Sequence, residues 1–198
     1  FHEEQHTVGV SLAVALTLLI LYLLSLFFSF YTHKEYFLSV SHEKPTVKKS
    51  HAFLYMLGTI ILLVILSELF AKKIEAIAHA LNFGELFVGA VLVALAGNAA
   101  EHLGAVHFAR KDKMSLVLNV TIGSSLQIAM FVAPLLTFIS LGLGNFMSLT
   151  FLPLEIIAIL ASVLLINEVS RDGRVNWFEG IQLVALYLVI AVLFYFHP

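Results

Sequence analysis

The stretch of sequence that decides this chain's architecture is Gly97-Asn98-Ala99-Ala100-Glu101-His102. It puts a glycine, an amide, a carboxylate and an imidazole in the middle of a long apolar segment. Ionisable side chains at membrane depth are energetically costly, and they usually face the protein interior as ion or proton sites. The stretch therefore predicts a polar site inside a membrane-spanning helix.

The composition around this stretch is that of a membrane protein. Of the 198 residues, 60% are hydrophobic and 12% are charged, whereas about a quarter of an average soluble domain is charged. The formal net charge is −2, and no basic cluster is interleaved with aromatic residues, so we expect no nucleic-acid partner. Without cysteine, disulfides and thiolate metal sites are excluded.

Six apolar segments reach the roughly 20 residues that a helix needs to cross a bilayer. They predict an all-α integral membrane protein with six transmembrane helices. The segments are Val8–Phe30, Ala52–Ala71, Glu85–Ala109, Met114–Ile139, Leu149–Asn167 and Trp177–Phe196.

The connection Tyr31–Ser50 is the only stretch that looks like a linker between two halves of a molecule. We therefore expect three parts: residues 1–30, a linker of residues 31–51, and residues 52–198. The chain begins with Phe1, and its first apolar run lacks the basic flank and cleavage pattern of a signal peptide. We expect it to be a fragment of a longer protein.

The basic residues predict an orientation, because cytoplasmic loops are enriched in lysine and arginine. All of the 11 lysine and arginine residues except Lys72 and Lys73 lie in alternate connections on one side of the bundle. This places the linker in the cytosol and both ends of the chain on the extracytoplasmic or lumenal side.

Gly97 lies about 18 Å along a helix from Glu85, close to the midplane of a core about 30 Å thick. Asn98 and Glu101 are three residues apart and share a helical face, while His102 points about 100° away from Glu101. Gly97 lets the helix unwind and frees backbone carbonyls, and hard cations such as calcium prefer such oxygen ligands. A stripe of small residues for close helix packing is an equally weighted interpretation of Gly97.

Glu101 and His102, the two titratable residues of the motif, also have alternative interpretations. Glu101 could instead be a protonated structural carboxyl or the partner of a basic residue. His102 is either a group that hydrogen-bonds between helices or a residue with a proton-linked role, because histidine titrates near neutral pH.

The fourth apolar segment carries a second polar group of residues, Gly123-Ser124-Ser125-Leu126-Gln127. Ser124 and Gln127 are three apart on one helical face. Their neutral oxygens help to replace a hydration shell without adding charge, so Ser124, Ser125 and Gln127 are candidate cation ligands. Serines in membrane helices also commonly bond their own backbone, which we expect of at least one of the two.

Three further acids lie in or near the membrane and are second-tier candidates: Glu155, Glu68 and Glu85. Glu155 stands in an otherwise apolar run. Solvated helix ends explain most of the others equally well.

These residues resemble the calcium/proton exchangers (CAX) of the cation/calcium exchanger superfamily. Gly97–His102 is similar to the signature of that family's second repeat, and Gly123–Gln127 follows as the family pattern requires. Two connecting stretches extend the resemblance over about Ala52 to Phe196: Arg110-Lys111-Asp112-Lys113-Met114 and Asp172-Gly173-Arg174-Val175-Asn176-Trp177-Phe178-Glu179-Gly180.

The resemblance implies two five-helix repeats of inverted topology, with residues 1–30 as the last helix of the first repeat and residues 52–198 as the second. It implies that Glu101 binds calcium and protons opposite a counterpart in the first repeat. It also implies that Asn98, Ser124, Ser125 and Gln127 line the site or its access path. No cofactor is expected, since calcium and protons are the cargo.

Two features depart from the family pattern. The basic, histidine-bearing linker favours a prokaryotic cell membrane, with a vacuolar membrane expected if the source is eukaryotic. No second Gly-Asn-x-x-Glu occurs in the sequence, so we expect the first repeat to come from another fragment or chain. A homo-oligomer remains open.

The function predicted is therefore calcium/proton antiport, which is transport and not enzyme catalysis. A sodium/calcium exchanger of the same superfamily and a passive cation channel are the alternatives. An intramembrane metalloenzyme is disfavoured, because no His-Glu-x-x-His is present.

Overall fold

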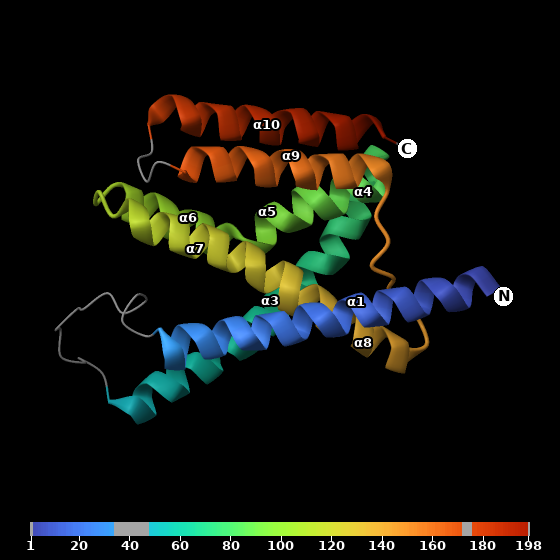
Figure 1. The fold of residues 1–198 in the computed structure, drawn as a ribbon, viewed down its shortest axis with the longest axis horizontal. Coiled ribbons are helices and arrows are strands. Elements are labelled where there is room, and N and C mark those ends of the chain that lie inside the picture. Colours follow the sequence, from blue (N-terminus) through green and yellow to red (C-terminus); the bar gives the residue numbers. More distant parts are fainter. Residues whose placement is uncertain (1, 34–47, 172–175, 198) are drawn as a thin grey trace. The chain divides into compact units, whose positions relative to one another are not determined.

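The computed structural model describes residues 2–33, 48–171 and 176–197, and all of the regular secondary structure in these ranges is helical (Figure 1). Most of the predicted linker, and residues 172–175 of the loop before Trp177, lie outside the described residues. The chain divides into two compact units, one of residues 1–39 and 100–176 and the other of residues 40–99 and 177–198.

The first unit is built around α1 (His2–Phe27), which ends in a π-helical turn, η1 (Phe28–Thr32). The rest of the unit is α6 (Ala99–Ala109), α7 (Met114–Gln127), η3 (Ile128–Val132), α8 (Ala133–Leu143) and α9 (Pro153–Ser170). η3 is also π-helical. Because it connects α7 directly to α8, the three form one continuous helical segment, Met114–Leu143.

α1 lies against η3 and α8 (Figure 1), and the buried residues of this contact are small or polar. Ala15 and Thr137 are completely buried, and Ser11 is 2% exposed. Tyr22 stacks on Phe131, with ring centroids 5.3 Å apart. Small residues let helix backbones approach closely, which is the usual basis of helix association in membranes.

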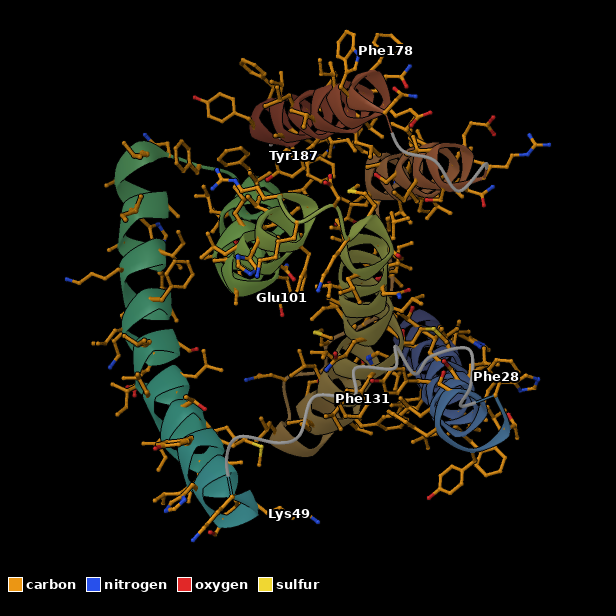
Figure 2. All side chains as sticks on the ribbon, turned by 90° about the vertical axis from the view of Figure 1, so that its left-hand side faces the viewer. Phe28, Lys49, Glu101, Phe131, Phe178 and Tyr187 are labelled. Carbon is orange, nitrogen blue, oxygen red and sulfur yellow. The ribbon has the colours of Figure 1, made fainter. Side chains whose placement is uncertain are left out.

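The second unit contains α3 (Lys49–Leu81), α4 (Glu85–Phe87), η2 (Val88–Val93), α5 (Ala94–Gly97) and α10 (Trp177–Phe196). η2 is the second of the three π-helical segments in the described part of the chain. Lys49, at the start of α3, is labelled in Figure 2.

Aromatic rings connect the residues at the start of α4 to the end of α10. Phe83, Phe87 and Tyr195 make edge-to-face contacts with centroids 5.2 to 5.9 Å apart. α3 ends at Leu81, and the next residue, Asn82, caps it with a φ of 53° in the left-handed region. Asparagine tolerates this region better than most residues. This turn brings Phe83 and Gly84 against α10.

Among the described residues, five helices are long and apolar enough to cross a membrane, and the bent pair Glu85–Gly97 and Ala99–Ala109 makes a sixth. The all-helical class and the number of spans agree with the sequence prediction. The inverted arrangement of the repeats stays a prediction.

Several span boundaries differ from the predicted ones, and two of them have a local cause. α3 continues ten residues past Ala71 to Leu81, because no glycine or proline lies between these two residues and Lys72 pairs with Glu68 one turn away at 2.8 Å. α9 starts at Pro153 instead of Leu149, since proline is favoured in the first turn of a helix and holds the preceding residue extended.

Candidate functional site

The motif Gly97–His102 lies at a break in its helix. α5 ends at Gly97, α6 begins at Ala99, and the two helical pieces are bent by 55°. Asn98 itself has φ −100° and ψ 15°, outside helical geometry. The prediction that the helix unwinds beside Gly97 is therefore confirmed, and the shared helical face predicted for Asn98 and Glu101 does not exist across the break.

The Asn98 side chain stabilises the end of α5. Its Nδ2 donates to the carbonyl oxygen of Ala94 at 2.9 Å, and its backbone N–H bonds to the same oxygen at 3.1 Å. One N–H of the amide is used in this way, and the Oδ1 oxygen, which is the acceptor of this side chain, has no hydrogen bond among the described residues. The sequence analysis did not identify Ala94, because every residue type has a backbone carbonyl and nothing in the sequence distinguishes this one.

Glu101 lies in the first turn of α6 and is half-buried (Figure 2). Within the described part of the chain, no hydrogen bond or ion pair engages its carboxylate. The alternative of a salt bridge to a basic residue therefore finds no support among the residues that the structure describes. An acid in the first turn is favourably placed, because the N-terminus of a helix carries a partial positive charge.

His102 follows Glu101 on α6 and is exposed. It has no hydrogen bond to another helix among the described residues, so its role stays a prediction.

The two serines of the second motif bond to one carbonyl of their own helix. Ser124 Oγ and Ser125 Oγ donate to the Thr121 oxygen at 3.1 and 2.9 Å. The Thr121 hydroxyl in turn donates to the Val117 oxygen at 2.8 Å. The backbone bonding expected of at least one serine is thus found for both, and each hydroxyl keeps oxygen lone pairs for a ligand.

Gln127 is the last residue of α7, and the π-helical turn η3 starts directly after it. Its side chain is exposed and has no hydrogen bond among the described residues. Most π-helical turns are single wide turns inside α-helices, and they occur frequently at functional sites.

The second-tier acids occupy other surroundings. Glu155 Oε2 accepts the backbone N–H of Leu152 at 2.6 Å and so caps the start of α9. Glu68 pairs with Lys72, and both side chains are about two-thirds exposed. Glu85 is exposed in the first turn of α4.

The described part of the chain brings no three acidic or histidine side chains together as a metal site. It holds the two motifs on separate helical segments, and no hydrogen bond among the described residues joins Glu101 to Ser124, Ser125 or Gln127. What the motifs share is their local chemistry. The Asn98 amide in one motif and the Ser124 and Ser125 hydroxyls in the other donate to carbonyls of their own helices, and their oxygens remain as acceptors.

Comparison with known proteins shows which family the chain resembles. Residues 51–196 match the family model described as sodium/calcium exchanger protein. The chain is 40% identical to a "Ca(2+)/H(+) antiporter" of Synechocystis, over 99% of this chain and 58% of that protein. It is 34% identical to "Ca(2+)/H(+) antiporter ChaA" of Bacillus subtilis, over 94% of this chain and 55% of that protein.

A eukaryotic relative is similar over a comparable region. "Vacuolar cation/proton exchanger 1" of Arabidopsis thaliana is 32% identical over 94% of this chain and 42% of that protein. The chain therefore spans about half the length of the curated relatives that it matches.

Proposed function

Because this chain belongs to the sodium/calcium exchanger protein family, we propose that it forms the C-terminal, cation-binding half of a calcium/proton antiporter. The relatives quoted above are named as antiporters or exchangers, so the activity expected is transport. The exchanger needs no cofactor, and calcium and protons are its cargo.

The observation that carries the proposal is the direction of the hydrogen bonds in the two motifs. The Asn98 amide and the Ser124 and Ser125 hydroxyls all donate to carbonyls of their own helices. One N–H of the Asn98 amide and both serine O–H groups are thus occupied, while the Asn98 Oδ1 and the two serine Oγ atoms keep lone pairs for a ligand. Oxygen lone pairs suit a hard cation and disfavour an anion.

The metal ligands proposed are Glu101, Asn98, Ser124, Ser125 and Gln127, with backbone oxygen supplied near Gly97. Calcium takes about six to eight oxygen ligands. Of this set only Glu101 carries a negative charge, and its carboxylate has no ion-pair partner among the described residues. We propose that a second carboxylate comes from the first repeat, because one carboxylate leaves half of the charge of Ca²⁺ uncompensated.

Exchange follows from competition at these carboxylates. Calcium binds when they are ionised and close together. Once calcium leaves, two like charges face each other, which favours uptake of a proton. A proton and a calcium ion therefore exclude each other, and His102 is the residue proposed to relay the proton. Alternating exposure would come from the rocking of helix groups around the site, as in other transporters with inverted repeats.

The topology belongs to the same proposal. Residues 52–198 form the second of two inverted repeats, residues 1–30 form the last helix of the first, and the connection between them is cytosolic. The site would lie near the midplane of the bilayer, with both ends of this chain extracytoplasmic or lumenal. The first repeat is the partner that this chain requires.

The test uses the full-length exchanger in proteoliposomes that contain a pH-sensitive dye. Addition of calcium outside should drive protons out of the vesicles in the unmodified protein, and Glu101→Gln should abolish this movement. Glu75→Gln is the matched control, because Glu75 is an exposed acid on α3 that lies outside both motifs. Calcium-driven proton movement that survives Glu101→Gln would contradict the proposal.

The same vesicles separate the two rival transport functions. A sodium/calcium exchanger would require a sodium gradient for calcium uptake and would ignore the pH gradient. A passive cation channel would equilibrate calcium without moving protons. Either result would overturn calcium/proton exchange and keep the family assignment.

A further inference from the structure

A proline, Pro134, follows the π-helical turn η3 that comes after the serine motif, and the proposed function gives this residue no role. In η3, the N–H of Ala133 bonds to the Ile128 carbonyl, five residues earlier. The next residue, Pro134, has no N–H, and in a regular α-helix its ring clashes with the carbonyl four residues before it, that of Met130. The wide turn gives the ring room, and the segment continues into α8.

A π-helical turn changes the register of everything on its N-terminal side. It holds one residue more than an α-helical turn, and each α-helical residue turns the chain by about 100°. Relative to α8, the motif Ser124–Gln127 is therefore rotated by about 100° from its position in an uninterrupted α-helix.

α8 is the fixed reference for this rotation, because it is anchored to α1 within the same unit. Pro134 and Thr137 are fully buried, and the Leu149 N–H that follows α8 donates to Ser11 Oγ of α1 at 3.1 Å. Phe131 of η3, which is labelled in Figure 2, stacks on Tyr22 of α1. Any change in the width of the turn must then move α7.

We propose that Pro134 is a positioning residue that keeps η3 wide and so sets which face of α7 the serine motif presents. The inference rests on the proposed function, in which Ser124, Ser125 and Gln127 bind the cation. Pro134 contacts no cargo and acts only through the rotation of these ligands.

The register argument makes a specific prediction for Pro134→Ala. Alanine restores the N–H and removes the ring, so η3 is free to tighten into an α-helical turn. Each motif residue then takes the place of its N-terminal neighbour, and Leu126 moves to where Ser125 was. Deletion of Ala129 in the same background removes the extra residue and restores the original rotation in a continuous α-helix. Ala129 is small and exposed, so its loss removes no buried packing.

The experiment labels single cysteines in the full-length exchanger, in a background free of other cysteines, with a water-soluble thiol reagent. Both side chains are exposed in this chain, but the proposed site places Ser125 on the aqueous cation path, so Ser125→Cys should react faster than Leu126→Cys in the unmodified turn. Pro134→Ala should exchange the two reactivities and raise the KM for calcium at least tenfold. Combining Pro134→Ala with deletion of Ala129 should return both the labelling pattern and the KM.

Pro153→Ala is the matched control, because Pro153 is an exposed proline in the first turn of α9 with no wide turn before it. It should change neither labelling nor KM. The proposal is overturned if Pro134→Ala leaves the labelling unchanged, or if its defect persists after Ala129 is deleted. If Pro134→Ala does not fold, recovery of folding by the deletion supports the proposal and failure to recover overturns it. The labelling pattern reports register alone, so it is independent of the Glu101→Gln test.

Discussion

Asn98 donates its side-chain amide to the carbonyl oxygen of Ala94 at 2.9 Å, one turn before the point where the span bends by 55°. The same oxygen accepts the backbone N–H of Asn98 at 3.1 Å, so the side chain adds a second donor to a carbonyl at the end of α5. The side-chain bond fixes the orientation of the amide and so the position of the Oδ1 oxygen. Asn98 thus both stabilises the helix end at the break, through its Nδ2, and presents a candidate cation ligand, its Oδ1.

Asn98→Asp separates these two properties. Aspartate replaces the NH2 group with a second oxygen, so the N–H donor is lost and the negative charge repels the Ala94 carbonyl. We expect a loss of about 0.5–1.5 kcal/mol in the free energy of unfolding, the usual contribution of one hydrogen bond, together with weaker calcium transport. Thermal unfolding in detergent and calcium uptake measure the two effects. Asn119→Asp, at an exposed position of α7, is the control and should change stability less. Equal changes in both variants would contradict the role of the Ala94 bond.

Ser124→Ala and Ser125→Ala test whether the serine oxygens bind the cargo. Each variant loses a bond to the Thr121 carbonyl, and because such bonds stay within one helix we expect the free energy of unfolding to change by less than about 1 kcal/mol. Each should nevertheless weaken calcium affinity by about tenfold, which corresponds to about 1.4 kcal/mol for one oxygen ligand. The readout is the calcium concentration that gives half-maximal transport.

Ser162→Ala is the matched control for the serine variants. Ser162 is also part-buried and donates to a carbonyl of its own helix, Ala158, at 2.8 Å, but it lies on α9 outside both motifs. It should show the same small change in stability with unaltered calcium affinity. A similar loss of affinity in Ser162→Ala would remove the argument for the motif serines.

Ser11→Ala should loosen the attachment of α1. The Ser11 hydroxyl is 2% exposed and accepts the Leu149 N–H at 3.1 Å, so alanine leaves that N–H without its acceptor. A buried donor without a partner costs about 1–3 kcal/mol. The apparent melting temperature should therefore fall. Ser29→Ala, which removes only a bond to Ser25 on the same helical segment, should have a smaller effect.

Gly84→Ala should destabilise the contact between Gly84 and the end of α10. A Cβ at this position would lie 3.2 Å from the backbone oxygen of His197, which is tighter than ordinary packing. We expect a loss of roughly 1 kcal/mol, at the lower end of the cost of overpacking. Gly58→Ala in α3 meets no atom within 4 Å and should stabilise its helix by up to about 1 kcal/mol. Opposite shifts in melting temperature are the expected result, and shifts of the same sign would contradict it.

Much of the site's chemistry was predictable, because its residue types are unusual where they occur. Gly97 and Asn98 stand out in an apolar segment, and the predicted unwinding of the helix is found at Asn98. The family predicted from Gly97–His102 and Gly123–Gln127 is confirmed by the match over residues 51–196. The assignment of the individual ligands remains a prediction.

The partners of these side chains were less accessible to sequence reasoning. The Ala94 carbonyl and the Thr121 carbonyl are backbone groups, and any residue type provides one. The wide turn before Pro134 had a visible signal, a proline inside an apolar span, yet proline alone does not distinguish a kink from a π-helical turn. Glu155 was set apart by its apolar surroundings, whereas its carboxylate caps the start of α9.

The sequence by itself determined the helical class, the approximate spans and the family, because apolar length and the placement of a few polar residues are properties of the chain that need no neighbours. Only the tertiary structure decided which carbonyls receive the side-chain donors and that α1 packs on α8. These outcomes depend on hydrogen-bond geometry and on contacts between segments far apart in the chain. The bond between Leu149 and Ser11, for example, joins residues 138 positions apart.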